Sequence, residues 1–478
     1  MHEPETISRS ESPPPPADQP QPVNRSALLI VFLVVFIDLL GFGIVLPLLP
    51  RFADEYVGTI VPGGKDTPLG GFIVGMLMSS FSLMQFLFAP VWGRISDRVG
   101  RRPILLLGLG GSVAFYGLFG FALSLPPEES AGLALALLFL ARSGAGIAGA
   151  TIATAQAVIA DCTPPEKRKH GMALIGAAFG IGFTFGPLFG YASLSWFPNN
   201  HEAIGYTAAL LSGIALILGM RLLPETRRFD ADPPVSRKLL DWSALKWALA
   251  SSALAPVILT FFLATLGFGA FEVTLALLLK DAMGFSEDNT FLVFAFVGLV
   301  LMLTQGFLYR RLARRVSEPT FMALGIVLMA LGVGALGGLS WLAMAEKARS
   351  FSTAATSITG LTATSPAGSY LAIPVIFHGL VLHPGKLVTL LLLALAAAVM
   401  GFAFLTPSAQ ALVSRRTDPD RQGEILGVNQ SAAAMARILG PIFGVTLYKA
   451  TASHLLPYVF GAGLLLLMLP LIPRIRRG

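Results

Sequence analysis

Four ionisable side chains lie inside long apolar stretches of the sequence, where a charge is costly. Two are acids, Asp38 and Glu272, and two are arginines, Arg142 and Arg437. A charge at the centre of a membrane helix costs about 2.5–3.5 kcal/mol on insertion scales, so such residues usually face the interior of a bundle and find a partner there. The four charges cancel, with one acid and one base in each half of the chain. We therefore expect Asp38 to pair with Arg142, and Glu272 with Arg437.

An acid beside an arginine is a candidate proton carrier. Desolvation raises the pKa of a carboxyl group and a nearby guanidinium lowers it, so moving either partner changes the proton affinity. Arginine stays protonated, so the expected role of Arg142 is to hold or release Asp38. The alternative is a permanent ion pair that only locks helices together.

A second group of residues is expected to line a cavity between helices. Gln156 follows Arg142 by 14 residues, which places both on one side of a continuous helix. An apolar cavity with a few polar anchors is typical of a small-molecule site. Hydrogen bonding between helices is the alternative for each polar residue, and plain packing for each phenylalanine. The expected lining residues are Phe42, Gln156, Phe268, Gln410, Asn429 and Gln430.

The elements that position these residues are predicted to be membrane-spanning helices. The chain is 54% hydrophobic and 13% charged, with a mean hydropathy of +0.72, whereas a soluble chain carries roughly a quarter charged residues. Many apolar runs approach the ~20 residues that cross a bilayer as a helix, and they lack the alternation of a membrane barrel. The sequence therefore predicts an all-α polytopic membrane protein. Its twelve expected spans are residues 26–50, 70–92, 103–125, 132–159, 171–195, 204–223, 254–279, 289–309, 320–345, 387–413, 425–448 and 454–473.

The spans divide into two related halves of six. Residues 155–190 align without gaps to residues 409–444, with ten of 36 positions identical, including a Gly-Pro-x-Phe-Gly run in each. This repeat predicts two pseudo-symmetric six-helix bundles. The expected organisation is a disordered cytoplasmic tail at 1–24, an N-terminal bundle at 25–223, a cytoplasmic connector at 224–253, a C-terminal bundle at 254–473 with an extracytoplasmic loop at 346–386, and a basic cytoplasmic tail at 474–478.

The distribution of Lys and Arg predicts the orientation. Of 34 such residues, 25 fall in loops on the side of the N-terminus and 7 in loops on the opposite side. Basic loops stay in the cytoplasm, so both termini are expected there, in the inner or plasma membrane of the cell. Because topology accounts for the net charge of +7, nucleic-acid binding is not expected.

Several motifs resemble those of the major facilitator superfamily. Residues 93–103 (GRISDRVGRRP) resemble its signature loop between spans two and three, and Arg142, Gly146, Ala148 and Ala150 resemble its span-four motif. Span five carries the glycines and proline of the motif associated with proton-coupled antiporters, although Tyr191 replaces the usual second glycine. The resemblance covers residues 26–473 and is strongest to the drug:proton antiporter branch, near tetracycline exporters and tetracycline-transporter-like proteins. In that superfamily the substrate site lies near the midplane, between the halves.

The resemblance implies roles for two further sets of residues. In the signature loop, Asp97 is expected near the start of span eleven, about Glu424, and Arg98 or Arg101 beside Asp161, so that the loop latches the cytoplasmic side. For the arginines, topology alone is the alternative. In span five the glycines form a smooth face for close helix packing, and the proline is expected to kink the helix. The expected gating set is Gly93, Asp97, Arg98, Gly100, Arg101, Arg102 and Asp161, and the antiporter set is Gly182, Gly186, Pro187 and Gly190.

These features predict a proton-coupled exporter of amphipathic or lipophilic small molecules that works by alternating access, as a monomer in the lipid bilayer. A proton-coupled importer of a sugar or organic acid, and a non-transporting receptor or assembly factor, are the alternatives. No enzyme is expected, because the sequence shows no phosphate loop and no nucleophile–base set. No cofactor or metal is expected either, and the proton is the predicted coupling ion.

Overall fold

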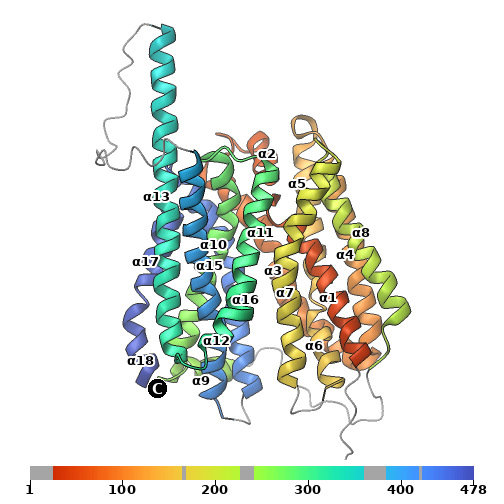
Figure 1. Cartoon of the computed structure of the whole chain (residues 1–478). Coiled ribbons are helices and arrows are strands. Elements are labelled where there is room, and N and C mark those ends of the chain that lie inside the picture. Colours follow the sequence, from red (N-terminus) through yellow and green to blue (C-terminus); the bar gives the residue numbers. More distant parts are fainter. Residues whose placement is uncertain (1–24, 164–167, 227–241, 360–383, 419–421, 478) are drawn as a thin grey trace, which may run out of the picture.

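The described residues form two helical bundles that stand side by side (Figure 1). The computed structural model describes residues 25–163, 168–226, 242–359, 384–418 and 422–477, and every regular element within them is a helix. Apolar runs form helices because the backbone satisfies its own hydrogen bonds there, which lipid cannot do. The all-α fold predicted from the sequence is confirmed.

The N-terminal bundle is built from eight helical segments. Thr67 begins one of them by accepting a hydrogen bond from the backbone N–H of Gly70, as an N-cap does. The segments are α1 (Arg25–Val45), α2 (Leu49–Ile60), α3 (Pro68–Val99), α4 (Arg101–Leu123), α5 (Pro127–Gly149), α6 (Ile152–Asp161), α7 (Arg168–Trp196) and α8 (Glu202–Leu222).

The C-terminal bundle follows a short helix, α9 (Trp242–Ala250). Ser286 caps the second long helix of this bundle by accepting a hydrogen bond from the backbone N–H of Asn289. The segments are α10 (Ala255–Asp281), α11 (Glu287–Leu303), a π-helical stretch (Thr304–Tyr309), α12 (Arg310–Leu312), α13 (Glu318–Thr359), α15 (Pro384–Arg415), α16 (Gln422–Lys449), α17 (Leu456–Leu466), a 3-10 turn (Leu469–Leu471) and α18 (Ile472–Arg477).

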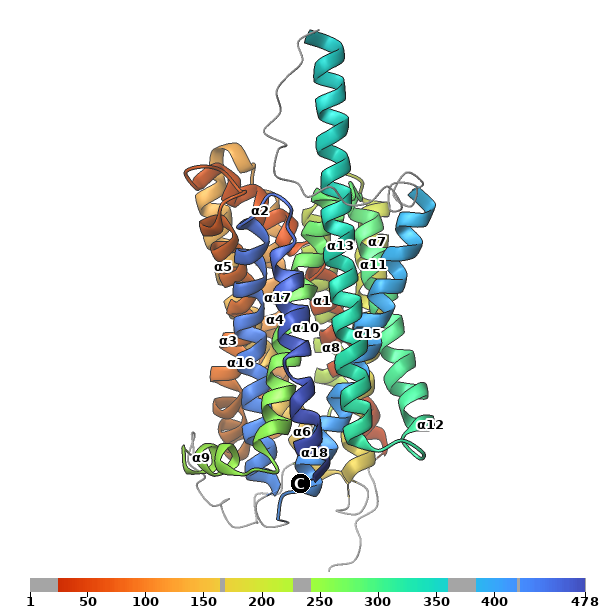
Figure 2. The ribbon, with the colours of Figure 1, turned by 90° about the vertical axis from the view of Figure 1, so that its left-hand side faces the viewer.

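Eleven helical stretches among the described residues are long and apolar enough to cross a membrane. In addition, α7 coincides with the remaining predicted span, 171–195, and continues as one helix through Pro187. We call the end of the bundles where α1 begins and α18 ends the terminal face (lower in Figure 1), and the end where α2 lies the distal face. At the distal face α13 projects beyond its neighbours (Figure 2) and continues to Thr359, so residues 346–359 of the expected loop are helical.

The predicted fourth span is interrupted. The N–H of Thr151 bonds to the carbonyl of Ala148, three residues back rather than four, and the N–H of Ala153 bonds to Ala150 in the same way. These tighter bonds separate α5 from α6, so residues 142–156 are not one continuous helix, and the placement of Gln156 on the face of Arg142 stays a prediction. Arg142 is buried, whereas Gln156 is exposed.

Within each bundle one helix crossing repeats the sequence duplication. In the N-terminal bundle a Cβ on Gly186 would lie 2.7 Å from Cα of Gly43, so only glycine lets α7 pack this closely on α1. In the C-terminal bundle a Cβ on Gly440, the residue aligned with Gly186, would lie 2.9 Å from the carbonyl oxygen of Leu266, at the crossing of α16 on α10. These crossings occupy matching places in the two halves, as the aligned Gly-Pro runs predict.

The two bundles meet along two symmetry-related helix pairs, α3 with α16 and α7 with α11. Toward the distal face both pairs are tightly packed, since a Cβ on Gly71 would lie 2.6 Å from the carbonyl oxygen of Val445, and one on Gly298 would lie 2.5 Å from that of Phe183. Toward the terminal face the packing loosens: a Cβ on Gly180 finds Met302 no nearer than 4.0 Å, and one on Gly93 meets nothing within 4 Å. The boundary between the halves is therefore closed distally and exposed on the terminal side.

Candidate functional site

Arg142 lies at the centre of the N-terminal bundle among aromatic rings. Its side chain is 2% exposed, and its guanidinium carbon lies 4.7 Å from the ring centre of Phe81 and 5.6 Å from that of Phe42. Such cation–π contacts help to hold a charge away from water. The atoms Nε and Nη1 have no hydrogen-bond partner among the described residues. The side chain of Asp38 lies outside the described residues, so its pairing with Arg142 stays a prediction.

Glu272 and Arg437 approach each other from the two crossing helices of the C-terminal bundle, α10 and α16. They interact electrostatically, yet no direct ion pair joins these two described residues. Glu272 is half-buried and Arg437 is exposed, although both lie within membrane-spanning segments. The structure thus brings together the acid and the base predicted for this half, and the acid has no salt bridge to any residue that the structure describes.

The residues expected to line the cavity differ in how deeply they are buried. Phe42 is half-buried against Phe81, with ring centres 4.9 Å apart. Phe268 is buried and stacks on Phe402 at 4.0 Å, so it serves packing in this conformation. Asn429 is fully buried, and its amide has no hydrogen-bond partner among the described residues. Of the remaining residues, Gln410 is half-buried, and Gln156 and Gln430 are exposed.

The antiporter glycines serve two different contacts. Gly182 and Gly186 face α1, where a Cβ on Gly182 would lie 2.9 Å from Cβ of Leu39. Gly190 instead faces the other half, since its Cβ would lie 2.4 Å from the ring of Phe291 on α11. The motif therefore joins α1 within one half to the boundary with the other half.

At the terminal face, the signature loop forms a cluster within the N-terminal half. The guanidinium of Arg101 lies 2.5 Å from Asp97 Oδ1 and 3.1 Å from Asp161 Oδ2. The contact between Arg101 and Asp161 expected from the sequence is present. Asp97 was also expected near Glu424, whose side chain lies outside the described residues. Arg98 is exposed beside this cluster.

Glu225 holds the start of α4, a contact that was not predicted from the sequence. Its carboxylate accepts hydrogen bonds from the backbone N–H groups of Arg101 and Arg102, at 2.9 and 3.1 Å. Gly100 makes the tight turn before this helix with φ +111°, and a Cβ there would lie 2.5 Å from Glu225 Oε2. An anion with two backbone donors at a helix N-terminus is a stabilising cap.

The Glu225→Gln variant is expected to lose about 1 kcal/mol of stability, because the amide keeps the size of the side chain and loses its charge. The measurement is the thermal unfolding midpoint in detergent. Glu128→Gln is the matched control, since Glu128 is an acid in the first turn of α5, a helix that begins at prolines. An equal loss in both variants would show that the cap bonds of Glu225 contribute nothing beyond a general helix-end charge.

A second cluster, at the distal face, joins the two halves and was missed by the sequence analysis. Lys449 is fully buried and lies 3.0 Å from Asp54 and 2.9 Å from Asp66. Asp281 Oδ2 is 3.9 Å from the same ammonium. We call Asp54, Asp66, Asp281 and Lys449 the distal cluster.

Other polar contacts cross the boundary beside the distal cluster. Arg51 donates to the carbonyl oxygen of Phe285 at 3.1 Å and to the hydroxyl of Thr290 at 2.9 Å. Two further ion pairs also join the halves here, Lys280 with Glu55 at 2.8 Å and His201 with Glu287 at 3.3 Å. Polar contacts thus reinforce the closed distal side.

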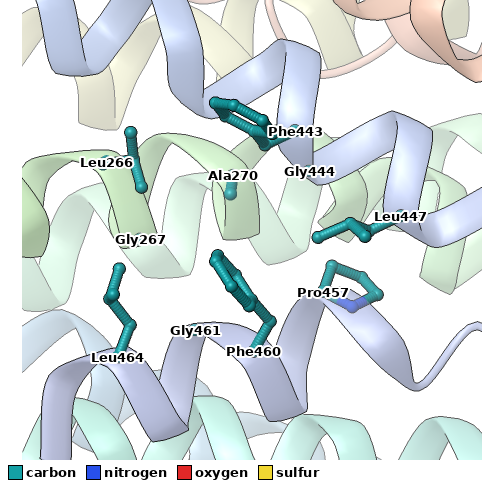
Figure 3. Close-up of a pocket in the computed structure, with 10 residues that line it drawn as sticks. All are labelled: Leu266, Gly267, Ala270, Phe443, Gly444, Leu447, Pro457, Phe460, Gly461 and Leu464. Atoms are coloured by element: carbon teal, nitrogen blue, oxygen red, sulfur yellow. The ribbon is translucent and has the colours of Figure 1, made fainter. Parts of the chain in front are cut away.

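An apolar groove lies apart from this boundary, on the surface of the C-terminal bundle between α10, α16 and α17 (Figure 3). Phe443 and Phe460, on its rim, are about half exposed. All the lining residues belong to one half, so the groove is separate from the space between the halves. They are Leu266, Gly267, Ala270, Phe443, Gly444, Leu447, Pro457, Phe460, Gly461 and Leu464.

The chain is similar to known membrane transporters over most of its length. A family model described as Major Facilitator Superfamily matches residues 31–373. The class C tetracycline resistance protein of Escherichia coli is 29% identical over 458 residues, covering 94% of this chain and 97% of that protein. The crystal structure of the human organic anion transporter MFSD10 (TETRAN) aligns with a TM-score of 0.57 and 25% identity, over 95% of this chain and 100% of that one. The D-xylose-proton symporter aligns with a TM-score of 0.65 at 17% identity, over 94% and 97% of the two chains, and shows the shared fold.

Proposed function

Because the chain belongs to the major facilitator superfamily, we propose that it is a proton-coupled exporter of amphipathic or lipophilic small molecules. The observation that carries the proposal is the placement of Glu272, an acid within a membrane span that faces Arg437 without a salt bridge. A carboxyl group in such a place gains or loses a proton as its surroundings change. Similarity to tetracycline resistance proteins over almost the whole chain favours efflux.

The open terminal side defines how cargo reaches the site. We place the terminal face in the cytoplasm, since most Lys and Arg residues of the loops lie on that side. The present conformation then faces inward, with the distal side closed. Cargo enters from the cytoplasm or the inner leaflet between the exposed parts of α3 and α16, where Gln430 and Arg437 are exposed.

Transport of the proton and of the cargo is coupled because both act on the same charged residues within the spans. In the proposed cycle, Glu272 and Asp38 take up protons when the distal side is open, and they release protons toward the terminal side. An ionised Glu272 attracts the guanidinium of Arg437, whereas a protonated one leaves Arg437 free to bind cargo or other groups. Phe42 and Gln410, both half-buried, supply the apolar and polar contacts to the cargo.

An organic anion is the second candidate for the cargo. Arg437, an exposed residue within a membrane span, carries a fixed cation that an anionic group would neutralise. Human MFSD10, which shares the fold, is an organic anion transporter.

Transport into vesicles with an acidic lumen tests the proposal. A proton antiporter lets protons leave the lumen and accumulates cargo there, so the lumen becomes alkaline when cargo is added. We would use ethidium, a permanently charged amphipathic cation, and a sulfonated fluorescent dye, a permanent anion, because neither is trapped by the gradient alone. Tetracycline serves as the zwitterionic probe.

Accumulation of any one probe above protein-free vesicles, with alkalinisation of the lumen, is the expected result. The proposal is wrong if none of the three changes the luminal pH. Movement of a probe out of the lumen together with protons would instead identify a symporter, which is the direction of the importer alternative.

A further inference from the structure

The distal cluster gathers three carboxylates around one ammonium at the boundary between the halves. Asp54 and Asp66 belong to the N-terminal half, whereas Asp281 and Lys449 belong to the C-terminal half. When all four are ionised, the cluster carries two uncompensated negative charges. Opening the distal side would therefore separate Asp54 and Asp66 from both Asp281 and Lys449.

Asp54 is the most deeply buried carboxylate of the distal cluster. It is fully buried, and neither of its oxygens has a hydrogen-bond partner among the described residues, although Lys449 lies 3.0 Å away as an ion pair. Asp66 is largely exposed and accepts a hydrogen bond from Lys449, and Asp281 accepts one from the hydroxyl of Tyr448 at 3.3 Å. Burial favours the neutral form of the Asp54 carboxyl group, and the Lys449 ammonium beside it favours the charged form.

The electrostatic surroundings also favour Asp54 as the group that accepts a proton. Burial raises the pKa of Asp54, against the opposing charge of Lys449. Burial also acts on Asp66, but the hydrogen bond and charge of Lys449 outweigh it and lower the pKa of that carboxyl group. Asp54 is therefore the member of the pair that takes a proton first.

The groups that face Asp54 come from every side of the boundary. Lys65 and Asp66 precede α3, Asp281 ends α10, and Tyr448 and Lys449 end α16. His454 stacks on the Tyr448 ring at 4.1 Å and acts on Asp66. The other helix packed on α2, α5, contributes no charged group that acts on Asp54 within the described part of the chain.

We propose that closing the distal side binds a proton at Asp54, so that the distal cluster is a second protonation site, separate from Glu272. The inference rests on the proposed alternation between conformations. In the open state Asp54 is separated from both Asp281 and Lys449 and is hydrated. Because burial affects Asp54 more strongly than Lys449 does, it binds a proton more weakly in the open state than in the closed state. Lower pH therefore shifts the equilibrium toward the closed distal side, through the pH range between the two proton affinities.

Distance measurements across the distal boundary test whether lower pH closes the distal side. Thr59 and Ala452 are exposed and belong to different halves, so nitroxide labels on Thr59→Cys and Ala452→Cys report opening once the single native cysteine is removed by Cys162→Ala. The protein is placed in lipid nanodiscs without cargo or gradient and measured from about pH 8 down to about pH 4, the ordinary pKa of an aspartate. The closed-to-open ratio of the labelled parent is expected to rise as the pH falls, with Asp54 contributing at most about tenfold per pH unit.

Matched variants isolate Asp54 from other titrating groups. His201 crosses the same boundary, and its hydrogen bond with Glu287 raises its pKa, so it adds a response of the same sign. Because His201 and Glu272 are common to parent and variant, the difference between the parent and Asp54→Asn reports Asp54 alone. Asp54→Asn is expected to remove that part of the response and stay closed, while Asp66→Asn, the same change in the same cluster, retains it.

A second variant tests the proposal independently if Asp54→Asn does not fold. Lys449→Gln removes the cation that opposes protonation of Asp54, so the midpoint of the response is expected to move to higher pH. The proposal is overturned if Asp54→Asn keeps the pH response of the parent, if Lys449→Gln leaves the midpoint unchanged, or if the distal side opens as the pH falls. Because no cargo is present, failure of the vesicle transport assay leaves these outcomes unaffected.

Discussion

Replacing Glu272 by glutamine is expected to abolish cargo accumulation driven by a pH gradient. The amide keeps the shape of the side chain on α10 but is always neutral. The attraction between residue 272 and Arg437 can therefore no longer be switched on and off by a proton. We expect the initial rate of gradient-driven uptake to fall at least about tenfold. The measurement is probe accumulation in vesicles with an acidic lumen, at matched protein content.

Exchange without a gradient separates coupling from binding. Vesicles loaded with unlabelled cargo should still exchange it for labelled cargo through Glu272→Gln, because exchange requires no change of protonation. Glu128→Gln is the matched control, since this acid is exposed in the first turn of α5. Retention of full gradient-driven uptake by Glu272→Gln would remove Glu272 from the coupling mechanism.

The fold could be predicted because its determinants are local or repeated. Apolar runs of helical length give the spans, and the aligned Gly-Pro runs predict that α16 crosses α10 as α7 crosses α1. The structure shows both crossings, at the aligned positions Gly440 and Gly186. The contact of Arg101 with Asp161 could be predicted for a different reason, since the signature loop and the end of span four both occur in a recognised family pattern.

Contacts between distant segments could not be predicted in this way. Lys449 and Asp66 are 383 residues apart, and each looks like an ordinary charge near the end of a span. The break between α5 and α6 was also missed, because Ala150 and Thr151 are compatible with a continuous helix and only their hydrogen bonds reveal the turn. Phe81 lies against Arg142 through packing of α3 on α5, which no spacing along either helix specifies.

Replacing Gly75 by valine is expected to open the distal side. A Cβ at this position of α3 would lie 2.7 Å from Cα of Ile442 on α16 and 2.8 Å from the carbonyl oxygen of Pro441. Backbone atoms cannot move aside as a flexible side chain does, so the two helices must separate. Overpacking of this kind costs about 1–3 kcal/mol, which shifts the closed-to-open ratio by roughly 5- to 150-fold. The label pair on Thr59→Cys and Ala452→Cys measures the shift.

The overpacking destabilises the closed conformation and not the folded state, because α3 and α16 belong to different halves. Gly332→Val offers the contrast: its Cβ would lie 2.3 Å from the backbone nitrogen of Ala398, within the C-terminal bundle, so that variant is expected to lose folded protein. Gly117→Val is the matched control, since a Cβ there meets nothing within 4 Å. If Gly75→Val loses folded protein as Gly332→Val does while the surviving molecules stay closed, the boundary between α3 and α16 is part of a fixed core. A widened distal distance at normal yield would identify the same boundary as the surface that separates during transport.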